Sequence, residues 1–438
     1  MSTADAFRTF LDNIRIDNGE TISLRYGEIT AALNKKFRDT ESKTANSLQV
    51  GSYGRSTAIK GVSDLDMIYI MPAGKWNDYK NGGQYRLLRA CADAISDRYP
   101  STTVKVDRLV VRVLYKYFHI EVQPVFEQGD GSFSYPDSYG DGSWKITKPR
   151  GEIEAMKEFN EQKNNNLRRL ARMVRAWKNK HGVAMGGLLI DTLAYNFLKQ
   201  TDEYNDRSYL YYDHMSRDFF KFLADQPKQE YYAALGSNQR VKVKKDFRKK
   251  AKKAHELCLK AIEAENEEYR NDRWRKVYGR NFPPRPAAEL AESAIKSDGF
   301  TARNTEHFID DMFPIDIRYD IELDCEVTQA GFRPSFLRHL LASSAILLQQ
   351  KRLRFFVTQT TVPSPFTLYW KVLNRGPVAV RRDCIRGQIV RDEGHYERRE
   401  STDFRGDHVV ECYVVKDGVV VATDRIHVPI SAERAQGG

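Results

Sequence analysis

Apolar residues follow a helical period through several stretches of the first part of the chain. Between residues 20 and 38 they return every three or four positions, at Ile22, Tyr26, Ile29, Leu33 and Phe37. A spacing near 3.6 residues is typical of a helix that buries one face. The same spacing predicts a helix near residues 84–98 and a long helix over about residues 153–180.

Shorter runs that are rich in β-branched and aromatic residues lie between these helices and predict strands. They cover residues 47–51, 64–71, 107–115 and 118–126. Pro72 ends the second run, and the last two runs predict a hairpin that turns around Lys116. Residues 127–152 are rich in Gly, Ser, Asp and Tyr, so we expect a loop there.

The hydrophobic pattern changes near residue 300, after the proline-rich stretch 281–289. Segments such as RLRFFVTQT, TLYWKVLNRG and HVVECYVVKDGVVVATDRIHVPI alternate or run apolar between turns. The last contains Asp417-Gly418, a strong signal for a tight hairpin. These features predict an all-β sandwich of immunoglobulin-like type. We therefore expect two domains, residues 1–300 and 301–438, the first with strands at about 47–126 and a helical part at about 153–280.

Composition argues against membrane-spanning, secreted and disulfide-rich classes of protein. Charged residues make up 29% of the 438 residues, and no apolar run approaches the length that a membrane span needs. The N-terminus, MSTADAFRTF, carries acidic residues and lacks the apolar centre of a signal peptide. Five scattered cysteines form no Cys-x-x-Cys pair, so neither a disulfide framework nor a zinc ribbon is indicated. We expect a soluble cytoplasmic protein with no membrane partner.

The net charge of +11 suits a protein that handles nucleotides, free or polymeric. Much of this charge lies in RVKVKKDFRKKAKKAHELCLKAIEAENEEYR. There, apolar residues recur at helical spacing from Phe247 to Ala261, and lysines and arginines crowd the opposite side. This side is either a solvated helix face or a docking surface for an activating polyanion.

Two aspartates, Asp64 and Asp66, stand inside the apolar run Asp-Leu-Asp-Met-Ile-Tyr-Ile. Side chains alternate along a strand, so both carboxylates project from one face. They repel each other unless protons or cations neutralise them. They are either a strand end that faces water or a site for two divalent ions, Mg²⁺ or Mn²⁺. Upstream, Gly51 would let phosphates approach the backbone closely, and the Ser52 hydroxyl could hold a triphosphate.

The order strand, Gly51-Ser52, short helix, Asp64-x-Asp66 resembles the signature of the DNA polymerase β-like nucleotidyltransferases, in particular the cGAS/DncV-like second-messenger synthases. The resemblance implies an α+β fold, with a polymerase β-like core and a helical lobe before the β-sandwich. It also implies a third acidic metal ligand, and Glu121, in Glu-Val-Gln-Pro, stands where that family usually has aspartate. The alternative for Glu121 is an ion pair across the hairpin with Arg112 or Lys116.

Two basic residues of the long helix occupy related positions. In the family a lysine near the end of this helix faces the triphosphate, and here Arg175 takes its place, with Lys178 nearby. Each is either a phosphate contact or a solvated helix charge.

The C-terminal region carries a second resemblance. The pieces TEHFIDDMFP, CEVTQAGFR, YWKVLNRG, RGQI and ESTDFRGDHVVECYVV look like the adenylyl/guanylyl cyclase and SMODS C-terminal sensor domain, over roughly residues 301–432. The polar members of these pieces serve either in turns and edge pairing or in a ligand-sensing pocket. They include Arg386, Glu400, Arg405 and His408.

Together the resemblances imply a metal-dependent enzyme that joins ATP, GTP or other ribonucleotides into a cyclic di- or trinucleotide messenger. The product would activate a downstream effector in bacterial defence against phage. Two alternatives stay open: a nucleotidyltransferase that modifies RNA or protein, and a catalytically weakened nucleotide or nucleic-acid sensor.

Overall fold

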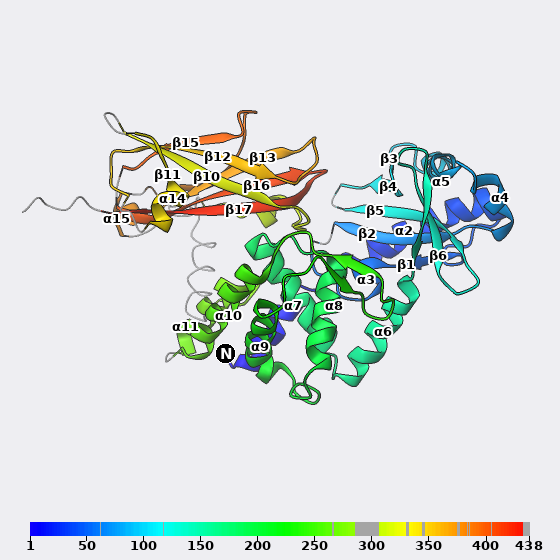
Figure 1. Ribbon diagram of the computed structural model, residues 1–438, viewed down its shortest axis with the longest axis horizontal. Helices are drawn as coiled ribbons and strands as arrows, with labels where there is room; N and C mark the ends of the chain where they lie inside the picture. The colour runs from blue at the N-terminus through cyan, green and yellow to red at the C-terminus, as the bar shows by residue number, and fades with distance from the viewer. Residues whose placement is uncertain are drawn as a thin grey trace, which may run out of the picture. The chain divides into compact units, whose positions relative to one another are not determined.

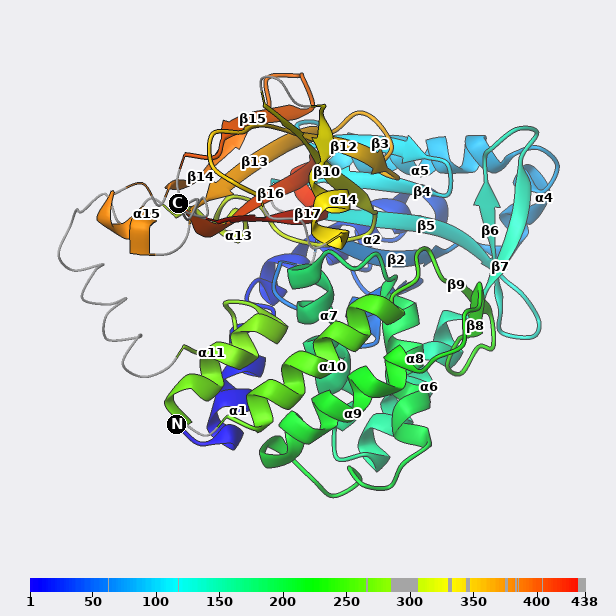
Figure 2. The same ribbon diagram turned by 60° about the vertical axis from the view of Figure 1, so that its left-hand side comes forward.

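A computed structural model describes residues 1–61, 63–116, 118–264, 267–284, 306–329, 333–343, 347–374, 377–382, 384, 386–403 and 405–431. The chain divides into two compact units, Met1–Lys180 with Met185–Arg285, and His181–Ala184 with Pro286–Gly438. Figures 1 and 2 show the elements of each unit. The domain boundary that we expected at residues 300 and 301 lies outside the described residues.

The first unit is built on a sheet of seven strands. They are β1 (Ser47–Gln49), β2 (Asp64–Ile70), β3 (Thr103–Asp107), β4 (Val110–Leu114), β5 (His119–Glu127), β6 (Phe133–Asp137) and β7 (Ser143–Thr147). The main order is β1-β2-β5-β4-β3, and β6 pairs with β5 and β7. Strands β2 and β5 run parallel, whereas the neighbouring pairs β1–β2 and β4–β5 are antiparallel.

Two predicted helices, α2 (Gly19–Arg38) and α5 (Gln84–Arg98), share one hydrophobic core with the sheet. The sheet contributes alternate residues to it, among them Leu65, Met67, Val111, Ile120 and Val122. Burying an aliphatic side chain fully stabilises by about 1.5–3 kcal/mol, so this face anchors the strands. Because strand side chains alternate, Asp64, Asp66 and Glu121 project from the opposite face.

Helices form the rest of the first unit. They are α1 (Thr3–Asn13), α3 (Gly51–Gly54), α4 (Trp76–Tyr79), α6 (Pro149–Gln162), α7 (Asn166–His181), α8 (Gly187–Lys199), α9 (Tyr212–Ala224), α10 (Arg248–Ile262) and α11 (Glu267–Tyr278), with short 3₁₀ turns at Ala73–Lys75 and Tyr209–Tyr211. A small hairpin, β8 (Tyr231–Ala233) and β9 (Arg240–Lys242), lies between α9 and α10. As predicted, α10 buries its alanines and Cys258, and Lys252 and Lys253 are exposed.

Two expectations for this unit were wrong. The long helix over residues 153–180 is broken into α6 and α7, because Asn164 and Asn165 take left-handed backbone angles, φ 50° and 63°. Asparagine tolerates this conformation better than most residues. The expected loop at residues 127–152 contains the hairpin of β6 and β7, whose strands carry polar turn-forming residues among their aromatic ones.

The second unit contains two antiparallel sheets of four strands, ordered β11-β10-β12-β15 and β14-β13-β16-β17. Their bounds are β10 (Ile321–Thr328), β11 (Ser335–Phe336), β12 (Arg352–Thr360), β13 (Thr367–Leu373), β14 (Arg386–Arg391), β15 (Glu397–Ser401), β16 (Gly406–Lys416) and β17 (Val419–Ile430). The short helices are α13 (Ile309–Met312), α14 (Leu337–Ala342) and α15 (Pro377–Arg381).

Both sheets supply one core, in which Leu323 and Phe355 of the first meet Trp370 and Cys412 of the second. The expected β-sandwich is therefore present, and the α+β fold class is confirmed.

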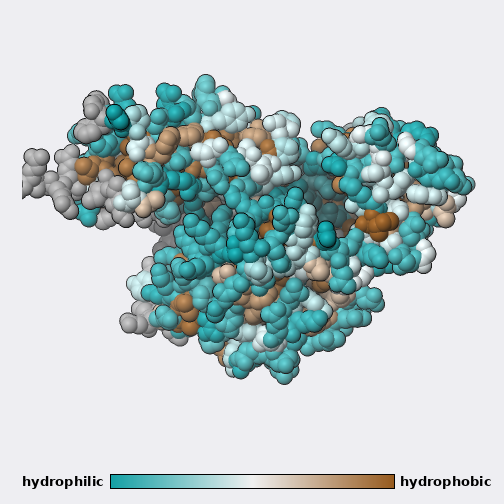
Figure 3. All heavy atoms as spheres, in the orientation of Figure 1, coloured by the Kyte–Doolittle hydropathy of each residue, from teal (hydrophilic) through white to brown (hydrophobic). Residues whose placement is uncertain are grey.

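The surface agrees with the charged composition. None of the described helices is long and apolar enough to cross a membrane. On the face drawn in Figure 3, hydrophilic residues predominate over the helical part of the first unit.

Candidate active site

The predicted carboxylates lie on two adjacent parallel strands of the first unit. Asp64 and Asp66 belong to β2, and Glu121 belongs to β5. The register pairs Asp64 with His119 and Asp66 with Glu121. Paired positions of neighbouring strands present their side chains on the same face. The fold therefore places four polar side chains on one sheet face from two segments that are distant in sequence.

His119 lies at the centre of this group. Its Nε2 atom is 2.8 Å from Asp64 Oδ1 and 3.3 Å from Glu121 Oε1, and its side chain is 3% exposed. Burial acts to lower the pKa of His119, but the hydrogen bonds to Asp64 and Glu121 outweigh it and hold the pKa above its usual value. One ligand atom from each of these three residues lies within 4.8 Å of the other two, a spacing that a metal ion could bridge.

Arg112 borders the same group from β4, where it pairs in register with Glu121. Its Nε atom is 3.5 Å from Glu121 Oε1, and its Nη2 atom is 3.1 Å from His119 Nε2. The ion pair that the sequence offered as the alternative for Glu121 is thus present. The guanidinium places one positive charge beside the carboxylates.

The Gly51 turn meets Asp66 directly. Gly51 has φ 62°, and a Cβ atom built there would lie 1.8 Å from Asp66 Oδ2. The backbone N–H of Val50 donates to the Asp66 carbonyl at 2.9 Å. Asp66 is not a member of the three-residue group around His119, because its carboxylate lies against this turn. Within the described residues, the Ser52 hydroxyl has no hydrogen-bond partner.

Arg175 is buried in the helical part rather than solvated. Its Nη1 and Nη2 atoms lie 2.7 Å and 3.0 Å from the two carboxylate oxygens of Asp191. Nη2 also donates to the Gly187 carbonyl at 3.1 Å. Lys178 is buried as well, with 4% exposure. Neither residue is a solvated helix charge, and the Arg175 guanidinium is occupied by its Asp191 pair.

Asp191 is the centre of a buried polar network. Besides Arg175, it accepts from Arg55 Nε at 2.8 Å and from Thr57 Oγ1 at 3.1 Å. Arg55 Nη1 reaches Glu152 Oε2 at 3.1 Å. Burial acts to raise the pKa of Asp191, but the charges of Arg175 and Arg55 lower it below its usual value. Burial raises the pKa of Glu152.

The network joins the Gly51 turn to the helices, because Arg55 directly follows α3. No sequence pattern predicted a role for His119, Arg55 or Asp191. Asp191 could have been noticed, because it is a single acidic residue inside the apolar helix GLLIDTLAYNFLK. A buried carboxylate requires a cation, so this position predicts a basic partner.

Two of the expected sensor residues in the second unit form an ion pair. The Arg386 guanidinium lies on the Glu400 carboxylate, with Nη2 3.0 Å from Oε1, and Arg398 Nε is 2.8 Å from the same oxygen. His408 is buried on β16, and Arg405 is exposed just before that strand.

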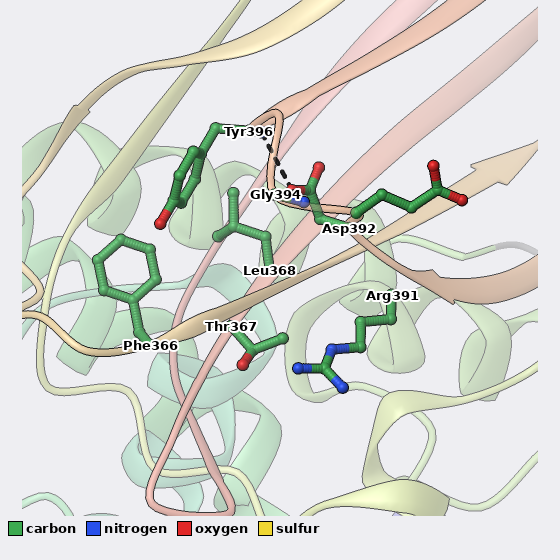
Figure 4. Close-up of a pocket in the computed structure, with 8 residues that line it drawn as sticks. Phe366, Thr367, Leu368, Arg391, Asp392, Gly394 and Tyr396 are labelled. Atoms are coloured by element: carbon green, nitrogen blue, oxygen red, sulfur yellow. Dashed lines mark hydrogen bonds between the residues drawn. The ribbon is translucent and has the colours of Figure 1, made fainter.

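A cavity of about 470 Å³ lies elsewhere in the second unit, and none of the four expected sensor residues lines it. Figure 4 shows the rings of Phe366 and Tyr396 together at one end and Arg391 beyond Thr367. The ring centroids are 5.9 Å apart. Asp392 Oδ2 accepts from the backbone N–H groups of Gly394 and Tyr396 at 2.8 Å and 3.0 Å, which fixes the loop.

Comparison with known proteins finds a family match within each unit. Residues 1–160 match the Second Messenger Oligonucleotide or Dinucleotide Synthetase (SMODS) domain, and residues 303–431 match the Adenylyl/Guanylyl and SMODS C-terminal sensor domain. A cyclic AMP-AMP-AMP synthase from an Acinetobacter species is 23% identical over 262 residues, which cover 56% of this chain and 74% of that protein.

Two solved structures are similar to parts of this chain. CdnC of Escherichia coli MS115-1 with ATP is 15% identical, with TM-score 0.49, and the match covers 65% of this chain and 99% of that chain. The apo form of Vibrio cholerae DncV is 14% identical, with TM-score 0.45, over 54% of this chain and 69% of that chain.

Proposed function

We propose that this chain, a cGAS/DncV-like nucleotidyltransferase with a SMODS domain and a C-terminal sensor domain, makes a cyclic di- or trinucleotide from ribonucleoside triphosphates. The observation that carries the proposal is the contact between the Gly51 turn and Asp66, with Asp64 and Glu121 on the same sheet face. It puts a backbone that a triphosphate can approach beside carboxylates that favour divalent cations.

The residues present fit a divalent metal site, because Asp64, Asp66 and Glu121 offer hard oxygen donors on one face. We propose that they hold two Mg²⁺ or Mn²⁺ ions. When bound, such ions activate an attacking hydroxyl and stabilise the charge on a leaving pyrophosphate. Without them, the carboxylates would repel the triphosphate.

The protein's own part in the reaction is to position the nucleotides. Gly51 would let the triphosphate lie against the backbone, and the Ser52 hydroxyl would donate to a non-bridging phosphate oxygen. A ribose hydroxyl oxygen of one nucleotide then forms a bond to the α-phosphorus of the next. Pyrophosphate leaves with the electrons of the broken P–O bond, and the hydroxyl proton passes to water. Repetition closes the ring.

We assign Arg175 to support of the Gly51 turn through Asp191 and Arg55, because its guanidinium is already paired. Lys178, which is also buried, is the second basic candidate from the helix for a phosphate contact.

We further propose that residues 1–300 form the catalytic domain and residues 301–438 a domain that responds to an activating signal. Within the latter, Arg405 and His408, with the paired Arg386 and Glu400, are the candidate ligand contacts. The exposed lysines of α10 are candidates for contact with a polyanion. The enzyme would act in the cytoplasm, where its NTP substrates are, and its product would activate an effector against phage.

The full chain incubated with labelled ATP and GTP, with Mg²⁺ or Mn²⁺, tests the proposal. We expect a labelled product that resists phosphatase because it has no free terminal phosphate. Asp64→Asn combined with Asp66→Asn should abolish it, whereas Asp93→Asn, on the exposed surface of α5, should not.

Label transferred to added RNA or protein instead would favour a modifying enzyme. Nucleotide binding without any product would favour the weakened sensor. Wild-type product from the double variant would rule out this site.

A further inference from the structure

We propose that His119 is itself a metal ligand, and that with Asp64 and Glu121 it forms a mixed nitrogen and oxygen site that prefers Mn²⁺ to Mg²⁺. The inference rests on the proposed function only in that a divalent ion binds at this sheet face. It adds a ligand of a different chemical class to the carboxylates expected there.

The spacing of the three ligand atoms suits one ion. Adjacent ligands of an octahedral ion with bonds of about 2.1 Å lie about 3.0 Å apart, and opposite ligands about 4.2 Å apart. His119 Nε2 is 2.8 Å from Asp64 Oδ1 and 3.3 Å from Glu121 Oε1. One ligand atom of each of the three residues lies within 4.8 Å of the ligand atoms of the other two. The two distances from His119 Nε2 therefore match those between adjacent ligands of one ion, and the third ligand atom lies close enough for small side-chain movements to complete the set.

The contacts of Nε2 also point to a cation. A guanidinium has no acceptor atom, so the 3.1 Å contact from Arg112 Nη2 requires the lone pair of Nε2. The contacts to the Asp64 and Glu121 carboxylates require a proton on the same nitrogen. One nitrogen cannot meet both demands at once. A divalent ion bound to the lone pair would attract both carboxylates and displace the Arg112 contact.

The strand register holds His119 in this place. Asp64 and His119 are paired across the parallel strands β2 and β5, and the imidazole is 3% exposed. A buried ring has little freedom to turn away, so its nitrogen is preorganised toward the carboxylates. Arg112 is 15% exposed and comes from the adjacent strand, and its charge competes with the ion for the same lone pair.

The donor set determines the preferred metal. Mg²⁺ takes oxygen ligands and retains much of its water, whereas imidazole nitrogen suits first-row transition ions. Mn²⁺ accepts both carboxylate oxygen and imidazole nitrogen. We therefore expect tighter binding of Mn²⁺ than of Mg²⁺.

Pulsed EPR of the full chain loaded with Mn²⁺, without nucleotide, tests the inference by a readout that does not depend on turnover. A directly bound imidazole gives a ¹⁴N coupling to the manganese. We expect this coupling in the wild type, its loss in His119→Gln, and its retention in His255→Gln, whose ring contacts the Arg217 carbonyl in the helical part.

Titration calorimetry should show that His119→Gln weakens Mn²⁺ binding by roughly tenfold or more, as even loss of a residue that only orients a ligand does so. Arg112→Gln should bind Mn²⁺ more tightly than the wild type, because the competing charge is gone. This second variant keeps the inference testable if His119→Gln does not fold.

Bound Mn²⁺ without ¹⁴N coupling in the wild type would overturn the inference, even if cyclic product is made. Coupling in a protein that makes no product would instead overturn the proposed function and leave His119 as a ligand. Equal Mn²⁺ affinity of the wild type and a folded His119→Gln variant would also overturn the inference.

Discussion

The backbone of Gly51 passes so close to the carboxylate of Asp66 that a Cβ atom on Gly51 would lie 1.8 Å from Asp66 Oδ2. The turn that we propose for phosphate binding and the second aspartate are therefore one structural feature. Neither can change without moving the other.

Gly51→Ala should abolish product formation. The added methyl group overlaps Asp66 and also meets a backbone with φ 62°, where side chains are strained by roughly 1–2 kcal/mol. Gly74→Ala is the control, because a Cβ there has nothing within 4 Å. Product assays and thermal unfolding would separate lost activity from lost fold. A fully active Gly51→Ala enzyme would contradict the assigned position of the Asp66 carboxylate.

Ser52→Ala should raise KM for NTP more than it lowers kcat. A hydrogen bond to the triphosphate exists in both the ground and transition states, so its loss mainly weakens binding. Such a charge-assisted bond contributes about 1.5–3 kcal/mol, or roughly tenfold or more in KM. The hydroxyl has no partner among the described residues, so its removal should leave the fold unchanged. Ser101→Ala, on an exposed turn, is the matched control, and an unchanged KM for Ser52→Ala would move the phosphate contact to another group.

Asp191→Asn should destabilise the first unit strongly. It removes the negative charge that the buried Arg55 and Arg175 share, and breaking a buried ion pair costs about 3–5 kcal/mol. Asp225→Asn removes an exposed partner of Lys221 and should cost no more than about 1 kcal/mol. Urea unfolding measures both, and equal effects would show that the network contributes little to stability.

The ionisation of Asp191 makes the stability of the first unit depend on pH. The folded pKa of Asp191 lies below its usual 3.8, so the unfolded chain takes up a proton first as the pH falls. The stabilisation from Asp191 is therefore present above about pH 4 and is lost as the pH falls through the folded pKa.

The wild type should lose more stability than Asp191→Asn between pH 6 and pH 3. Glu152, whose raised pKa acts in the opposite direction, is present in both proteins and contributes to both curves. A parallel loss in the two proteins would exclude an ionised Asp191 in the folded state.

Local sequence was sufficient for some parts of the site and not for others. The alternation around Asp64 and Asp66 predicted the strand and its exposed face, because burial of Leu65 and Met67 forces that choice. The role of His119 depends on the parallel register of β2 and β5, which no local pattern encodes.

The pairing of Arg55 with Asp191 could not be predicted for the same reason. Arg55 and Asp191 are 136 residues apart, and their contact follows only from packing α8 against the Gly51 turn. The break at Asn164 and Asn165 was readable in principle, because a run of asparagines favours left-handed turns over helix.

Substitutions of Glu121 show whether this residue is a metal ligand or only the ion-pair partner of Arg112. If it is a ligand, Glu121→Gln should eliminate product, because the neutral amide no longer offsets the ions' charge. Glu121→Asp should keep part of the activity, with better support from Mn²⁺ than from Mg²⁺, since Mg²⁺ demands near-ideal octahedral geometry at roughly 2.0–2.1 Å. Product assays with each ion measure both effects.

The ion pair alone predicts a different outcome. Its contact with Arg112 is 3.5 Å long, and the amide of glutamine keeps an oxygen that can accept from the guanidinium. Loss of that pair would leave a Glu121→Gln enzyme nearly as stable and as active as the wild type. Arg112→Gln breaks the same pair while keeping the carboxylate, so this variant should still make product with Mn²⁺. An active Glu121→Gln enzyme would therefore remove Glu121 from the metal site and assign it to the hairpin.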